Sequence, residues 1–87
     1  MMSPGEIRQL RKDMGVSQRE FGEILNATQA AVSQWESGVK RPDQRTQAIL
    51  QGLRQKVDEK GQDFVAELLK LAGTVGLVVI LAKIFGE

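Results

Sequence analysis

The stretch SQREFGEILNATQAAVSQWESG, from Ser17 to Gly38, decides the fold of this chain. It opens with a capping box, a serine followed three residues later by a glutamate, and then places apolar side chains at helical spacing. A two-residue turn follows, and Thr28 caps a second run with the same spacing. The stretch therefore predicts two short helices, Gln18–Leu25 and Thr28–Ser37, joined by a tight turn.

Two further helices flank this pair. The sequence Ser3-Pro4-Gly5-Glu6 is another capping box, and it opens a helix that Gly15 ends. Asp43 caps a fourth helix that runs towards Lys60, and strand-like alternation is absent throughout this half. We therefore expect an all-α bundle of four to five helices. The apolar residues expected to face its core are Ile7, Leu10, Met14, Phe21, Ile24, Leu25, Ala31, Val32, Trp35, Ile49, Leu50 and Leu53.

The composition argues against catalysis and metal binding. The 87 residues include no cysteine, histidine or tyrosine, which removes imidazole acid–base chemistry, Ser–His triads and Cys/His zinc sites. We expect no enzyme, no cofactor and no metal. The formal net charge of +1 is too small to indicate a nucleic-acid partner by itself. The first residues lack the apolar core of a signal peptide, so we expect a cytoplasmic protein.

A different composition begins at Gly61. The stretch from Leu71 to Ala82 carries no charge, and a helix that is apolar almost all round must be covered. We therefore divide the chain into a helical domain, residues 1–60, and an apolar C-terminal helix, residues 61–87, expected to drive oligomerisation. The apolar stripe assigned to this contact consists of Phe64, Leu68, Leu71, Val75, Val78 and Ala82.

The C-terminal segment has two other interpretations. One is a membrane anchor, although the uncharged run is shorter than the roughly 20 residues that span a bilayer. The other is docking, either onto the fourth helix of the same chain or onto a different protein such as a toxin. The valines and isoleucine of 75–80 are also compatible with a strand.

The helical half resembles the Cro/C1-type (XRE) family of phage and bacterial DNA-binding regulators. The resemblance covers roughly residues 5–54. Three short motifs stand at the family's spacing: Ser17-Gln18 where the helix pair begins, Trp35-Glu36-x-Gly38 where it ends, and Arg41-Pro42 in the loop that follows. The matching residues are Ile7-Arg8-x-Leu10-Arg11, Gly15-Val16-Ser17-Gln18, Phe21-Gly22, Val32-Ser33-Gln34-Trp35-Glu36-Ser37-Gly38 and Arg41-Pro42.

The resemblance implies a role for each matching position. It implies that Arg11 and Glu36 form an ion pair joining the first helix to the third, and that Gly22 lets the second and third helices approach closely. The residues expected to contact base edges in the major groove are Thr28, Gln29, Ala30, Ser33 and Gln34. Those expected to contact DNA phosphates are Gln18, Arg11, Ser37, Lys40 and Arg41.

These observations favour a sequence-specific transcriptional regulator, in particular a dimeric repressor bound to double-stranded DNA. A homodimer is expected because two linked recognition helices read a palindrome far better than one. Two alternatives are an antitoxin-like interaction protein, whose C-terminal helix binds a partner, and a membrane-tethered DNA-binding protein. No ligand-binding domain is visible in the sequence.

Overall fold

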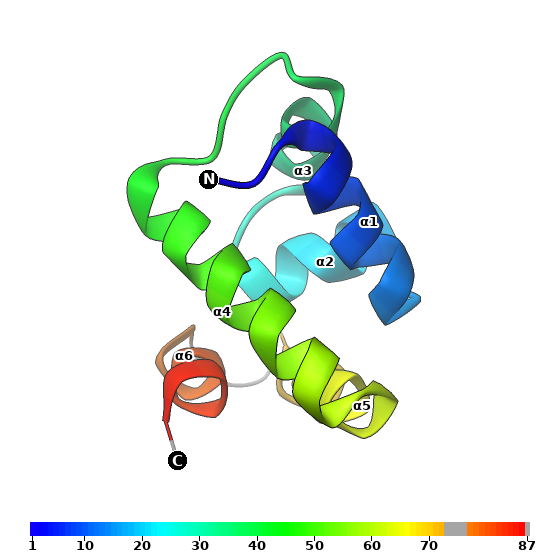
Figure 1. Ribbon diagram of the computed structural model, residues 1–87, viewed down its shortest axis with the longest axis vertical. Helices are drawn as coiled ribbons and strands as arrows, with labels where there is room; N and C mark the ends of the chain where they lie inside the picture. The colour runs from blue at the N-terminus through cyan, green and yellow to red at the C-terminus, as the bar shows by residue number, and fades with distance from the viewer. Residues whose placement is uncertain (73–76, 87) are drawn as a thin grey trace.

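The computed structural model describes residues 1–72 and 77–86, and all regular structure in these ranges is helical. The expected all-α helix-turn-helix bundle is confirmed (Figure 1). The helices are α1 (Pro4–Met14), α2 (Gln18–Leu25), α3 (Gln29–Ser37), α4 (Gln44–Lys60), α5 (Gln62–Leu71) and α6 (Leu77–Phe85).

The helix ends follow the caps in the sequence. The Ser3 hydroxyl accepts a hydrogen bond from the Glu6 amide, and the Glu6 carboxylate accepts one from the Ser3 amide. The same reciprocal pair joins Ser17 and Glu20 at the start of α2. Each capping box satisfies backbone donors that the first helical turn leaves free, so these two starts are set by local sequence.

A single apolar core runs through the whole described chain. Of the twelve residues expected to face inward, eleven are buried and Ala31 is partly buried against the same core. The core continues past Gly61, because Phe64, Val65 and Leu68 of α5 and Ile80 and Ile84 of α6 join it. The C-terminal segment therefore packs on the helical half of its own chain, one of the arrangements that the sequence left open.

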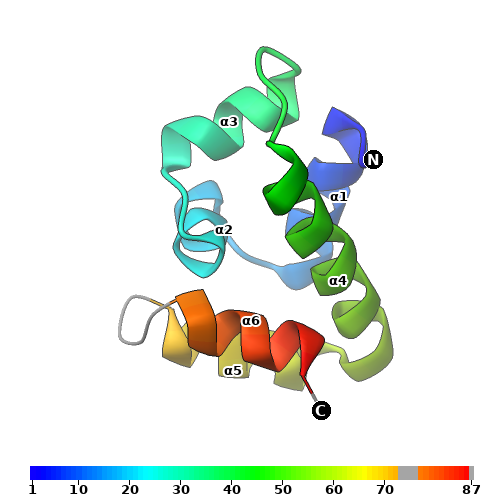
Figure 2. The same cartoon turned by 90° about the vertical axis from the view of Figure 1, so that its left-hand side faces the viewer.

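The apolar C-terminal segment forms two helices instead of the expected one, which brings the described helices to six. The cap of α5, Ala72, has extended backbone angles, and α6 begins at Leu77. Figure 2 shows α5 and α6 side by side beneath the other helices. Among residues 1–72 and 77–86, no helix is long and apolar enough to cross a membrane.

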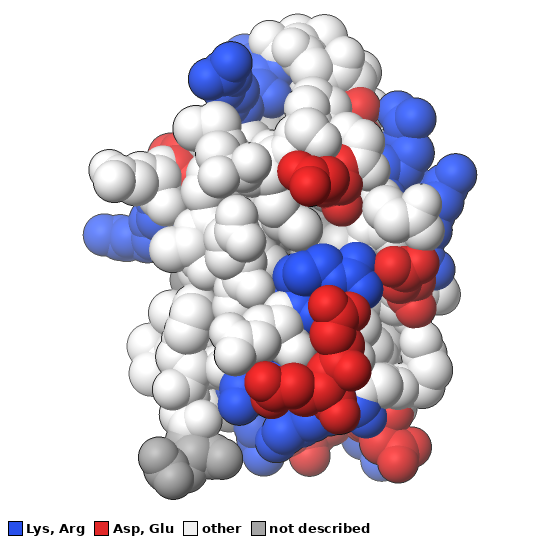
Figure 3. Space-filling model, viewed as in Figure 1, with Lys and Arg blue, Asp and Glu red and all other residues white. Residues whose placement is uncertain are grey.

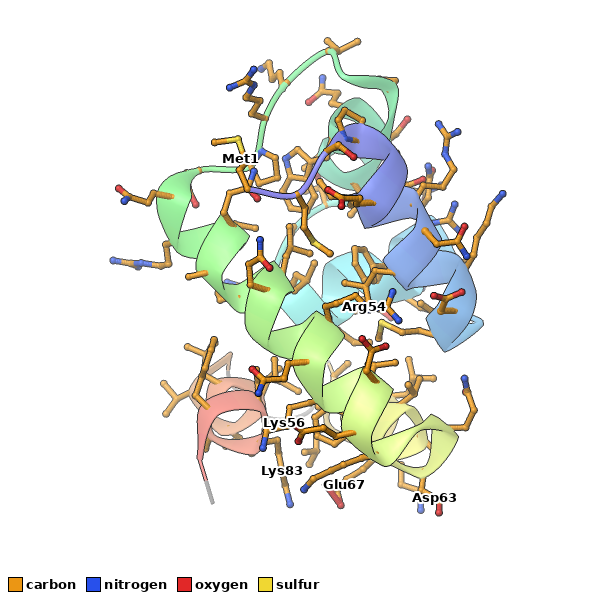
Figure 4. The ribbon with its side chains drawn as sticks, in the orientation of Figure 1. Met1, Arg54, Lys56, Asp63, Glu67 and Lys83 are labelled. Atoms are coloured by element: carbon orange, nitrogen blue, oxygen red, sulfur yellow. The ribbon has the colours of Figure 1, made fainter. Side chains whose placement is uncertain are left out.

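Polar contacts link α4 and the start of α5 to the end of α1. The Arg54 guanidinium on α4 lies 3.0 Å from the Asp13 carboxylate at the end of α1, and it also pairs with Asp58 one turn along its own helix. The Gln62 amide at the start of α5 donates to the Asp13 carbonyl at 2.9 Å. These contacts fix α1, α4 and α5 relative to one another. Figure 4 labels Arg54, the member of this group on α4.

Candidate nucleic-acid interface

The exposed side of α3 is the centre of the candidate interface. The Thr28 hydroxyl caps the helix by accepting from the Ala31 amide at 3.0 Å, and Gly38 ends it in the left-handed conformation. Val32 and Trp35 point into the core, which turns the opposite side of the helix to solvent. Of the five residues expected to read bases, Thr28, Gln29, Ala30 and Ser33 are exposed and Gln34 is half-buried.

The turn before α3 depends on a glycine at one position. A Cβ atom on Gly22 would lie 2.6 Å from the carbonyl oxygen of Ala27, closer than real Cβ contacts come. Asn26 caps α2 in the left-handed conformation, with φ 57°, which asparagine tolerates better than most residues. The absence of a side chain at Gly22 therefore lets α2 approach the start of α3 as closely as the turn requires.

A buried carboxylate connects α3 to the two preceding helices. The Glu36 side chain is only 2% exposed, and its two oxygens accept from Arg11 Nε at 2.7 Å and Arg11 Nη2 at 3.0 Å. Gln18 Nε2 donates to the same carboxylate at 3.3 Å. This bidentate geometry places Arg11 and Glu36 in the ion pair that the family resemblance implies. The network fixes α3 against α1 and the start of α2.

The charges of this network stabilise the ionised carboxylate. Burial raises the pKa of Glu36, but hydrogen bonds from Arg11 and Gln18 and the charges of Arg11 and Arg8 outweigh it, so the pKa lies below its ordinary value. The hydrogen bond to Glu36 in turn raises the pKa of Arg11. Both partners therefore stay charged at neutral pH, and the link between helices is an ion pair.

Arg8 belongs to this network, although no role was predicted for it from the sequence. Its Nη2 donates to the Glu36 carbonyl at 3.1 Å, and its Nε lies 3.7 Å from the Glu36 carboxylate. Two arginines therefore share one carboxylate, which leaves a net positive charge at this end of α3. The Arg8 side chain is 49% exposed, against 16% for Arg11, so Arg8 presents more of that charge to solvent. Arg8 stands three residues before Arg11, which places both arginines on one face of α1. This spacing was the sequence signal that could have placed Arg8 beside Arg11 in the network.

The remaining candidates for phosphate contact lie at two places. Gln18 is the first residue of α2, where backbone N–H groups lack helical partners. Ser37, at the end of α3, and Lys40 and Arg41, in the loop to α4, are all exposed. The Lys40 amide donates to the Gln34 carbonyl at 3.3 Å, which holds this loop close to the end of α3.

Charge is unevenly distributed over the surface that these elements form. Figure 3 shows acidic side chains mainly in the middle and lower part of this face, whereas basic ones lie at its upper end and both edges as well as among the acidic ones. In Figure 1, viewed from the same side, α3 lies at the upper end.

Within the described ranges, no group of three or more Asp, Glu, His or Cys side chains could hold a metal ion.

The six residues of the expected oligomerisation stripe do not share one environment. Phe64 and Leu68 are buried in the core of their own chain, and Leu71 is half-buried. Val78 and Ala82 are exposed on α6, and Val75 lies outside the described residues. Among the described residues of the stripe, only Val78 and Ala82 on α6 are exposed to solvent.

Comparison with known proteins finds a match for part of the N-terminal half of the chain. Residues 7–46 match a protein-family model described as helix-turn-helix. The match begins in α1 and ends just inside α4, so it includes α2, the turn, α3 and the loop that carries Lys40 and Arg41. No curated protein and no solved structure matches the chain.

Proposed function

We propose that the chain is a sequence-specific transcriptional repressor that reads the major groove with α3, on the premise that residues 7–46, which match the helix-turn-helix family model, are a DNA-binding unit of the Cro/C1 type (XRE). The observation that carries this proposal is the exposed side of α3, which presents Gln29 and Ser33 on a helix held by a buried ion pair. A recognition helix must be exposed and rigidly placed to meet base edges in register.

The side chains on α3 suit direct readout of adenine and thymine. Gln29 and Gln34 each offer an amide donor and acceptor, which match N7 and N6 of adenine. Thr28 and Ala30 each offer a methyl group that can contact the methyl group of thymine. The Ser33 hydroxyl can both donate and accept a hydrogen bond, so it can contact either adenine or thymine. Ala30 makes no hydrogen bond, so DNA shape is expected to supply part of the specificity.

Phosphate contacts are assigned to residues on both sides of α3. Gln18 is the first residue of α2, at the positive end of that helix, and Ser37, Lys40 and Arg41 lie at or just after the end of α3. Three N–H groups of the Arg11 guanidinium donate within the protein, two to the Glu36 carboxylate and one to the Val16 carbonyl. Only the other N–H groups of Arg11 can therefore contact a phosphate. These contacts set the register of α3 without reading sequence.

We propose a homodimer as the form that binds DNA, since two half-sites one helical turn apart give each copy an equivalent contact. A dimer predicts an inverted repeat in the target. The rival assignment, an antitoxin-like protein whose C-terminal helices bind an unlike partner, predicts instead a stable complex with a second polypeptide and a smaller role for DNA.

Selection of bound duplexes from a random pool, at one stated salt concentration, tests the proposal. We expect an inverted repeat with half-sites about one helical turn apart. Replacing Gln29 and Gln34 with alanine should weaken binding to the selected site by about 1–3 kcal/mol per lost bidentate contact and relax base choice. Gln51→Ala, at an exposed position on α4, is the matched control and should change neither. Unchanged base preference in the Gln29/Gln34 double variant would contradict the assignment of α3.

A further inference from the structure

A cleft of about 310 Å³ lies where the N-terminal residues, α1, α3 and the start of α4 meet. Its inner wall is apolar, because Met2, Ile7, Trp35 and Pro42 line it and all four are buried. The volume is at the lower end of the range for small-molecule sites, and an apolar wall with a few polar groups is typical of them. The cleft is therefore large enough for a small organic molecule.

One polar side chain of this cleft is buried with an unused donor. Gln47 on α4 lines the cleft and is only 7% exposed. Its Oε1 accepts from the Met2 amide at 3.2 Å, which fixes the orientation of the side-chain amide. Among residues 1–72 and 77–86, no group accepts a hydrogen bond from Gln47 Nε2. A buried donor without a partner is destabilising, so the cleft favours a ligand that brings an acceptor atom.

The charged side chains of the cleft are both cations. Lys40 and Arg41 line it and are exposed, so they lie on its outer side. The lining residues, all within the described part of the chain, include no aspartate or glutamate. Arg41 Nη1 donates to Sδ of Met1 at 3.8 Å, and Figure 4 shows Met1 beside the loop that leads into α4. A thioether sulfur is a weak acceptor, so a carboxylate would bind Arg41 better.

We propose that this cleft binds a small organic carboxylate with an apolar body. The side-chain groups that it offers to a ligand are the donors of Lys40, Arg41 and Gln47, because the Ser3 hydroxyl and Gln47 Oε1 already accept from backbone amides. An anionic acceptor satisfies these donors, and an apolar body covers the buried wall. A neutral apolar ligand would leave the donors unpaired, and a cation would be repelled by Lys40 and Arg41.

Binding requires a movement at the outer side of the cleft. The Gln47 Nε2 atom is itself buried, so a ligand atom reaches it only when a neighbouring side chain shifts. Met1 is suited to this movement, since its flexible side chain is 78% exposed and its contact with Arg41 is weak. A carboxylate that replaces the Met1 sulfur against Arg41 would open the cleft from this side.

Occupation of the cleft would compete with DNA. This step rests on the proposed function, which assigns Lys40 and Arg41 to phosphate contacts. A bound carboxylate and a DNA phosphate would then require the same cations. Loss of one or two phosphate contacts weakens DNA binding about five- to thirtyfold at physiological salt. The carboxylate would therefore act as an effector that releases the protein from DNA.

Titration of the full chain with 3-phenylpropionate, in the absence of DNA, tests the site. Trp35 lines the cleft and is the single tryptophan, so its fluorescence reports binding. We expect a saturable change with a Kd on the order of 1 mM, in keeping with a ligand of this size. The neutral 3-phenylpropanamide should bind at least about tenfold more weakly, because it lacks the charge. Acetate, which has the charge without the apolar body, should cause no change at the same concentrations.

Four variants locate the site. Gln47→Met removes the buried donor at similar size, and Arg41→Gln removes a charge, so each should weaken the binding of 3-phenylpropionate at least about fivefold. Gln55→Met and Arg45→Gln are the matched controls, since both residues are exposed on α4 and neither lines the cleft. Both controls should bind like the wild type. Arg41→Gln, at an exposed position, keeps the test decisive if Gln47→Met fails to fold.

The site is overturned by any of three results: no saturable change up to about 20 mM, equal binding of the amide, or wild-type binding by Arg41→Gln. Competition is measured on a selected duplex, where saturating 3-phenylpropionate should weaken wild-type binding about five- to thirtyfold and acetate at equal ionic strength should not. Carboxylate binding without a change in DNA affinity would overturn the competition. A wild type that binds the carboxylate but selects no specific DNA would count against the proposed function alone.

Discussion

Removal of the Arg11 side chain should destabilise the protein more than any other single change at the interface. In Arg11→Met, the Glu36 carboxylate stays buried at 2% exposure and loses both of its shortest hydrogen bonds. Breaking a buried ion pair by removing one partner costs about 3–5 kcal/mol. Gln18 at 3.3 Å and Arg8 at 3.7 Å remain near the carboxylate, which places the expected loss near the lower limit, about 3 kcal/mol.

Urea unfolding followed by the fluorescence of Trp35, the single tryptophan, measures this loss directly. In thermal unfolding followed by circular dichroism, about 3 kcal/mol corresponds to a fall in Tm of about 12–24 °C for a domain of this size. Arg19→Met is the matched control. Arg19 and its partner Glu23 are 3.9 Å apart and largely exposed, so its loss should change stability by less than about 0.5 kcal/mol.

The double variant Arg11→Met/Glu36→Met separates the value of the pair from the cost of an unpaired charge. Replacing both partners by apolar side chains of similar size should restore stability to within about 1 kcal/mol of the wild type, because no buried charge then remains. An Arg11→Met variant as stable as Arg19→Met would refute the argument. So would a double variant as unstable as Arg11→Met alone.

Three further predictions concern the glycine of the turn, the acid response and the phosphate contacts. Gly22→Ala places a Cβ atom 2.6 Å from the Ala27 carbonyl oxygen and should lower the free energy of unfolding in urea by about 1–3 kcal/mol. Gly5→Ala is the control, because its Cβ atom would meet the nearest atom at 4.0 Å, and it should leave the free energy of unfolding unchanged or raise it. The pKa of Glu36 is lower folded than unfolded, so its contribution to stability is present above the unfolded value of about 4.5 and is lost as pH falls through the folded one. Glu36→Gln should therefore lose less stability than the wild type between pH 5 and pH 3, and an equal loss would assign the acid response to other carboxylates. Neutralising Lys40 or Arg41 should weaken binding to all DNA sequences alike and reduce the slope of log Kd against log salt by about one each, and a change in base preference would contradict a phosphate role.

Much of the candidate interface could be predicted from residues close together in the chain. The caps at Ser3, Ser17, Thr28 and Asp43 determine where four helices begin, because each cap satisfies donors within its own first turn. The apolar spacing then determines which side of each helix is buried. These two local signals are sufficient to predict the helix pair and the exposed side of α3.

The tertiary structure decided what lies between distant residues. Arg8, Arg11 and Gln18 meet at Glu36 across separations of 18 to 28 residues, and the spacing of Arg8 and Arg11 places them on one face of α1 without showing which carboxylate they meet. The C-terminal segment shows the same limit, because its apolar stripe predicted burial without specifying the partner. Phe64 and Leu68 fill the core of their own chain, whereas Val78 remains exposed. Local sequence determines which side of a helix is apolar, but only the packing of all the helices determines how much of that side is covered.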